Sequence, residues 1–169
     1  MKKQVFLVVL LCAIAFSATA QQAVKIGPLG FLFGNYNLRY EKGISEKGSV
    51  QVGANYYSYE LFDVSSTGFG LDAAYRNYFK EAIRGAYVAP ALGFQTNTTS
   101  VSVDDDTSVG FSLLNIGATL GYQWVAGGGF VTDLGLGYGY NVELGKDDQL
   151  LNDYGGGGVK FTFAIGYAF

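Results

Sequence analysis

The last ten residues of the chain, Lys160–Phe169, alternate strictly between two kinds of side chain. Small or polar residues form one face, and the other face carries Phe161, Phe163, Ile165, Tyr167 and Phe169. Successive side chains of a β-strand point to opposite faces, so the segment is predicted to be a strand with one apolar and one polar face. At the edge of a sheet in a soluble protein, a strand with such an apolar face would promote aggregation. A strand between lipid and a narrow lumen requires this pattern.

The same alternation recurs along most of the chain. It is found near residues 48–60, 65–80, 84–98, 108–125, 128–144 and 157–169. Apolar residues recur at i+2, where i+3 and i+4 are glycine or charged, so these segments are predicted to be strands rather than helices. Although 49% of the residues are hydrophobic, no run after residue 20 is long enough for a transmembrane helix.

The connections and the chain ends together predict an even number of strands. Short turns at 46–48, 80–84 and 126–129 alternate with longer polar connections at 96–107 and 145–156, as in outer-membrane barrels. Both ends of the mature chain should lie on one side of the membrane. An inward strand near 34–43 therefore needs a first strand at 23–30, although Pro28 weakens that segment. The predicted fold is all-β: an eight-stranded antiparallel transmembrane up-and-down β-barrel.

Residues 1–20 have the features of a cleaved signal peptide. A short positive region precedes the apolar run Val5–Phe16, and Ala18 and Ala20 form an A-x-A cleavage site. An apolar run of about 12 residues is shorter than the roughly 20 that span a bilayer. We expect export and cleavage, which leave residues 21–169 as one outer-membrane β-barrel domain.

Charged residues occur on the predicted inward faces of the strands. An eight-stranded barrel is only wide enough for its own side chains, and an isolated buried charge is costly, so charges of both signs should pair. The predicted lumen charge network consists of Arg39, Glu41, Asp72, Arg76, Asp133, Glu143 and Lys160. Many glycines and alanines on the same faces leave space, so a polar path for ions or small solutes is an open alternative.

The longer connections are acidic. They carry Glu60, Asp63, the run Asp104–Asp106, Asp147, Asp148 and Asp153. Carboxylates are good ligands for divalent cations, but the spacing of an EF-hand loop is missing, so a solvated acidic rim is the expectation and cation binding stays open. An acidic surface also argues against nucleic acid as a partner.

The residues needed for most catalysis are missing. The chain has no histidine, and its single cysteine, Cys12, lies in the segment expected to be removed. Ser–His and Asp–His mechanisms and the usual transition-metal ligand sets therefore have no basis here. The run Gly155–Gly158 lacks the Lys-Ser/Thr and the helix of a phosphate-binding loop. We expect no enzyme activity, no catalytic residue, no metal and no cofactor.

Several short motifs resemble a family of small, uncharacterised outer-membrane proteins of Gram-negative bacteria. The motifs are KIGPLG (25–30), YEK (40–42), AYRNYF (74–79), GAYVAP (85–90) and LGYQW (120–124). The resemblance covers essentially the whole mature chain. It implies a β-barrel of OmpA or OmpX size in the bacterial outer membrane, and it supplies no mechanism because the family is a domain of unknown function.

The last strand also resembles the terminal strand of bacterial outer-membrane barrels, which acts as the signal for barrel assembly. The matching residues are Phe163, Ile165, Tyr167 and Phe169. The expected partners are outer-membrane lipid and, during biogenesis, the barrel-assembly machinery, and we expect a monomer. The predicted function is a non-enzymatic barrel with a side-chain-filled lumen that contributes to envelope structure or surface interaction. A narrow passive channel is the alternative, and a lipid-modifying enzyme is weakened by the absence of histidine.

Overall fold

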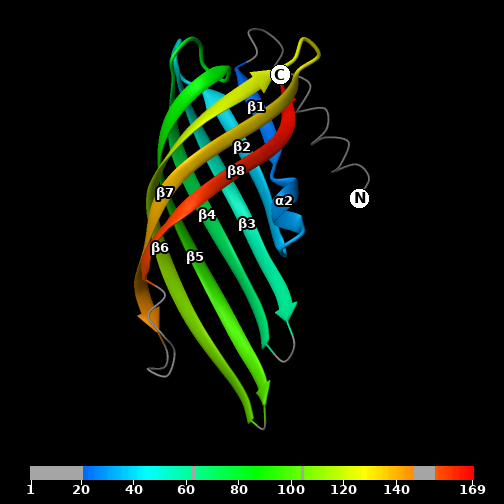
Figure 1. Ribbon diagram of the computed structural model, residues 1–169, viewed down its shortest axis with the longest axis vertical. Helices are drawn as coiled ribbons and strands as arrows, with labels where there is room; N and C mark the ends of the chain where they lie inside the picture. Colours follow the sequence, from blue (N-terminus) through cyan, green and yellow to red (C-terminus); the bar gives the residue numbers. More distant parts are fainter. Residues whose placement is uncertain (1–20, 62–63, 104, 147–154) are drawn as a thin grey trace, which may run out of the picture.

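Eight antiparallel strands form a closed barrel in chain order, and β8 pairs back to β1 (Figure 1). The computed structural model describes residues 21–61, 64–103, 105–146 and 155–169. The strands are β1 (Gln22–Ile26), β2 (Asn35–Gly43), β3 (Gly48–Leu61), β4 (Val64–Tyr78), β5 (Gly85–Val103), β6 (Asp105–Val125), β7 (Phe130–Lys146) and β8 (Gly156–Ala168). The predicted eight-stranded antiparallel up-and-down barrel is confirmed. The predicted signal peptide, 1–20, lies outside the described residues.

The two ends of the barrel differ. At one end, named here the short-turn end, residues 44–47, 79–84 and 126–129 join neighbouring strands, β1 begins and β8 ends. At the opposite end, the hairpin end, β5 and β6 continue until Val103 pairs with Asp105. The prediction of a long polar loop at 96–107 is therefore wrong. Threonine and valine, which recur between residues 96 and 103, favour strands. The ladder therefore continues beyond the apolar part of β5.

The prediction of a strand over residues 23–30 is only partly correct. Strand β1 ends at Ile26, and Pro28–Phe31 forms a short helix, α2. Proline has no N–H for the sheet ladder and has the backbone angle of a first helical position, so it ends the strand and begins the helix. The chain then enters β2 through Gly34, which has φ +68° and where a Cβ would collide with the Ser58 carbonyl. Only glycine fits that position without strain.

The outer surface of the barrel is apolar and has an aromatic belt toward each end. The belt near the short-turn end contains Tyr75, Phe79, Tyr122, Trp124, Phe130 and Tyr167. The belt toward the hairpin end contains Tyr36, Tyr56, Phe69, Phe94, Tyr138 and Tyr140. Aliphatic side chains lie between the belts, such as Leu71, Leu120 and Leu136, which are 55%, 64% and 61% exposed. No helix in the described part of the chain is long and apolar enough to cross a membrane.

Candidate functional site

Four buried charged side chains meet inside the barrel, in the half nearer the short-turn end. Lys25, Glu41, Arg76 and Asp133 come from β1, β2, β4 and β7, and we name them the lumen cluster. The Lys25 ammonium lies 2.6 Å from a Glu41 carboxylate oxygen and 3.0 Å from one of Asp133. The Arg76 guanidinium lies 2.7 Å from Asp133 and 3.6 Å from Glu41. Each cation therefore pairs with both carboxylates, and the charges balance.

Neutral side chains add hydrogen bonds to the lumen cluster, although the Nε of Arg76 is buried with no partner among the described residues. Ser49 and Tyr78 donate hydrogen bonds to Glu41 Oε1 at 2.5 Å and 2.7 Å, and the Tyr87 hydroxyl donates to Asp133 Oδ1 at 2.8 Å. Gln123 Oε1 accepts from Lys25 at 2.7 Å and from Arg76 at 3.2 Å. Buried ion pairs are tolerated when additional hydrogen bonds satisfy the charged groups in this way. Strands β1 to β7 all contribute a side chain.

Glycines opposite Tyr87 make room for its ring. In the cross-strand register Tyr87 faces Gly121 on β6, which in turn faces Gly135 on β7. A Cβ on Gly121 would collide with the Tyr87 ring, and one on Gly135 would lie 3.1 Å from its hydroxyl oxygen. The Arg76 guanidinium lies 4.3 Å from the centre of the same ring. The space that glycines leave at this level of the lumen is therefore occupied by an aromatic side chain.

The turn between β4 and β5 folds into the short-turn mouth of the lumen. Ala82 and Ile83 are 6% and 3% exposed and pack against Ala23 and Val131; these four residues are named the turn cap. The Gln123 side chain donates to the Ile83 carbonyl at 2.6 Å and so ties the turn cap to the lumen cluster. Ile83 has φ 70°, which is rare for a β-branched residue and persists only where surrounding contacts fix it.

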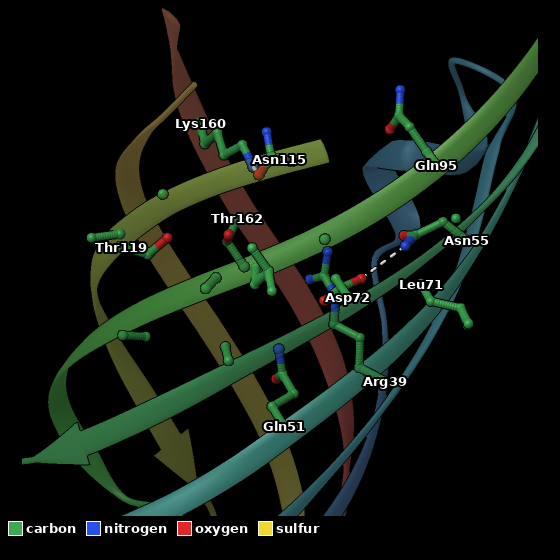
Figure 2. Close-up of a pocket in the computed structure, with 18 of the residues that line it drawn as sticks. Arg39, Gln51, Asn55, Leu71, Asp72, Gln95, Asn115, Thr119, Lys160 and Thr162 are labelled. Carbon is green, nitrogen blue, oxygen red and sulfur yellow. Dashed lines mark hydrogen bonds between the residues drawn. The ribbon is translucent and has the colours of Figure 1, made fainter. Parts of the chain in front are cut away.

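A second group of polar residues lines a cavity of about 270 Å³ nearer the hairpin end (Figure 2). Asn55 donates to the Asp72 carboxylate at 2.8 Å, and Lys160 donates to the Asn115 side-chain oxygen. Arg39 also lines the cavity, on the side where Asp72 lies. The lumen therefore contains two polar regions, the buried lumen cluster and this cavity.

The structure separates the residues predicted as one network. Glu41, Arg76 and Asp133 lie in the lumen cluster, whereas Arg39, Asp72 and Lys160 line the cavity, which Arg76 also borders. Glu143 lies farther along β7, toward the hairpin end. The sequence analysis did not include Lys25 or Gln123. Lys25 could have been found by parity, because it alternates with outward-facing Val24 in the predicted first strand.

The described residues show no group of three or more acidic, histidine or cysteine side chains able to hold a metal ion. Residues 63, 104, 147, 148 and 153 lie outside the described chain, and Glu60 is exposed near the end of β3.

Three comparisons with known proteins place these observations. A comparison with curated protein sequences finds no match. Among solved structures, the crystal structure of Ail, the attachment invasion locus protein of Yersinia pestis, matches with a TM-score of 0.56 and 16% sequence identity. The match covers 90% of this chain and 100% of that chain, and at this identity it concerns the fold. A family model described as "Protein of unknown function (DUF3575)" matches residues 5–151, which confirms the predicted resemblance to a family of unknown function. The chain belongs to the DUF3575 family.

Proposed function

We propose that the protein is a non-enzymatic β-barrel of the bacterial outer membrane whose lumen does not conduct ions, and that it contributes to envelope structure or surface interaction. The observation that carries this proposal is the combination of the lumen cluster and the turn cap. Side chains from β1 to β7 meet across the lumen, and Ile83 closes the mouth of the lumen at the short-turn end. The narrow passive channel predicted as an alternative would need a path through these groups.

The outer surface supports a position in a membrane. On β7, Phe130 belongs to one aromatic belt and Tyr140 to the other. The stretch of strand from Phe130 to Tyr140 rises about 33 Å, which is about 25 Å along the axis of a barrel with strands tilted about 40°. This matches the apolar band of roughly 25 Å found on outer-membrane barrels. On β4 the outward residues beyond the second belt are polar: Thr67 and Ser65 lie beyond Phe69 toward the hairpin end, and all three are exposed.

Closure of the lumen has an energetic basis. Removing one partner from a buried ion pair typically costs about 3–5 kcal/mol, because the remaining charge is left uncompensated. If opening a path required a comparable loss, roughly one molecule in a thousand would be open at a cost of about 4 kcal/mol. The two carboxylates of the lumen cluster, Glu41 and Asp133, are also fully buried and paired, so they are not accessible to a substrate.

The hairpin end supports the surface-interaction part of the proposal. Strands β5 and β6 are 19 and 21 residues long and reach farthest from the short-turn end (Figure 1). Their ladder continues past Phe94, where exposed Thr96 and Thr98 replace apolar residues. Residues in this part of the barrel would lie outside the bilayer and be accessible to partners.

Single-channel recording in a planar bilayer tests the closed lumen. The refolded mature chain should give no discrete current steps, provided that its folded state is shown by heat-modifiable migration on a gel. Reproducible steps from inserted protein would overturn the proposal and favour the channel. Export is tested separately: intact mass of the outer-membrane protein should correspond to a chain that begins at Gln21, and a retained segment 1–20 would contradict cleavage.

A further inference from the structure

The cavity near the hairpin end differs from the lumen cluster in its charge balance. Arg39 and Lys160 line it together with one carboxylate, Asp72 (Figure 2), and Arg76, whose charge is balanced within the lumen cluster, borders it as well. Among the residues described, neither Arg39 nor Lys160 forms an ion pair, whereas each cation of the lumen cluster pairs with two carboxylates. Asp72 already accepts a hydrogen bond from Asn55. The cavity therefore carries an excess of positive charge.

Polar atoms that face this cavity are also unpartnered. The Nε of Arg39 is buried with no hydrogen-bond partner, and so is the Oε1 of Gln51, a residue that is only 5% exposed. Both residues line the cavity, as does Asn35, whose buried side-chain oxygen likewise has no partner. Buried polar groups are normally hydrogen-bonded, so each exception requires an explanation. A guanidinium donor beside unused acceptors fits a ligand that is anionic and also carries a hydroxyl donor.

The barrel wall beside the cavity is incomplete. Strand β1 pairs with β8 only along Ile165–Ala168, so within the described chain Gly156–Ala164 pairs with β7 alone. We name this interruption the wall gap; helix α2 contacts both strands that flank it, β2 and β8. Cavity residues come from both flanks of the wall gap, with Asn35 and Arg39 on β2 and Lys160 and Thr162 on β8.

Apolar side chains border the wall gap on the outside. Leu32 and Phe33, directly after α2, are 77% and 78% exposed, and Val159 and Phe161 on β8 are 74% and 64% exposed. A volume of about 270 Å³ lies at the lower limit of small-molecule sites and accommodates a headgroup but not a whole lipid. A lipid bound here would place its headgroup in the cavity and its chains against this apolar border.

From these features we propose that the cavity binds a phosphate group, with Arg39 and Lys160 as its cationic ligands and Gln51 accepting a hydrogen bond from a hydroxyl of the same molecule. Arginine matches phosphate geometry through parallel N–H donors, and lysine adds a compact positive charge. The group has two possible sources, a phospholipid headgroup that enters through the wall gap or a small phosphate solute. The site adjoins the lumen cluster, because Arg76 and Tyr87 also line the cavity, but its proposed ligands Arg39 and Lys160 do not belong to that cluster. A non-conducting barrel and a phosphate-binding barrel are therefore tested by separate measurements.

The test uses the refolded mature chain in maltoside micelles, which contain no phosphate. Inorganic phosphate, dihexanoyl phosphatidylglycerol and dihexanoyl phosphatidylcholine are titrated separately by calorimetry at constant chloride. Saturable binding of inorganic phosphate or of phosphatidylglycerol is expected, weakened at least tenfold in Arg39→Gln and Lys160→Gln. The matched control is Arg84→Gln, which removes a cation that is 56% exposed at the short-turn end and should leave binding unchanged. In the unsubstituted protein, the NMR signal of Arg39 Nε should shift during the same titration.

The outcomes separate the sources. Binding of phosphatidylglycerol at least tenfold tighter than that of inorganic phosphate would assign the site to a membrane lipid, and equal or weaker binding of the lipid would assign it to a soluble phosphate. Absence of saturable binding by both probes, a stationary Arg39 Nε signal, or an equal loss in Arg84→Gln would overturn the proposal. Phosphatidylcholine carries the same phosphodiester without a headgroup hydroxyl, so its binding as tightly as phosphatidylglycerol would overturn the proposed role of Gln51 as an acceptor for a hydroxyl of the ligand.

Discussion

The Arg76 side chain contacts several members of the buried network at once. Its guanidinium reaches Asp133 at 2.7 Å, Gln123 at 3.2 Å and Glu41 at 3.6 Å. It also lies over the Tyr87 ring, so one planar cation links strands β2, β5, β6 and β7 from its own position on β4. Lysine could supply the charge, but not several donors in one fixed plane.

Truncation of this residue should destabilise the folded barrel. We expect Arg76→Ala to lower the free energy of unfolding by about 3–5 kcal/mol, because Glu41 and Asp133 would then share only Lys25. Urea unfolding followed by the fluorescence of Trp124 measures the change. Arg84→Ala is the control: its ion pair with Glu81, 3.5 Å long, is exposed and should contribute less than about 1 kcal/mol. Equal effects of the two variants would mean that Arg76 is not part of a buried network.

At the scale of elements, the turn between β4 and β5 is a structural component rather than a simple connection. The Ala82 amide donates to the Glu46 carbonyl of the neighbouring turn at 2.7 Å, and Ile83 is held from inside by Gln123. These contacts fix a backbone conformation that isoleucine rarely adopts on its own.

Loss of the Gln123 side chain should therefore loosen this turn. We expect the Ala82 amide to exchange with deuterium at least tenfold faster in Gln123→Ala, because the Ile83 carbonyl loses its partner and the strained turn can open locally. Gln95→Ala is a matched control, since Gln95 lines the cavity far along β5 from the turn. Unchanged exchange in Gln123→Ala would show that the hydrogen bond from Gln123 is not needed to hold the turn.

The C-terminal strand carries the predicted assembly signal. Phe169 closes the barrel through two backbone hydrogen bonds with Gln22, at 2.9 Å and 3.2 Å, which do not depend on its side chain. If the side chain is the signal, Phe169→Asp should reduce insertion in cells several-fold and leave refolding into micelles nearly intact. Phe169→Tyr serves as the control that keeps an aromatic terminus. Normal insertion of Phe169→Asp, measured by outer-membrane fractionation, would remove Phe169 from the proposed interaction with the assembly machinery.

The success of prediction differed between elements for a physical reason. Alternation with a period of two was sufficient to locate β3 to β8, because every side chain of a barrel strand faces either the outer surface or the lumen. It did not show that β5 and β6 continue through 96–107, where the outward residues are polar. The predicted first strand, 23–30, extends too far, because β1 ends at Ile26 and a helix begins at Pro28. The division of the predicted charges into a lumen cluster and a cavity could not be predicted, because it depends on the stagger between strands. The turn cap was missed because Ala82 and Ile83 resemble any short connection in the sequence.

At the scale of the whole molecule, the two aromatic belts predict how far a charge can be tolerated along one strand. Leu136 and Leu144 lie on the outward face of β7 and are 61% and 54% exposed, but Leu136 lies between the belts and Leu144 lies beyond Tyr140. Arginine at the midplane of a bilayer typically costs about 2–4 kcal/mol, and near the interface about 0–1 kcal/mol. We therefore expect Leu136→Arg to destabilise the barrel in phospholipid vesicles far more than Leu144→Arg, as measured by equilibrium urea unfolding. In a barrel surrounded by water the two substitutions would have similar effects, so equal losses would contradict the proposed position in the membrane.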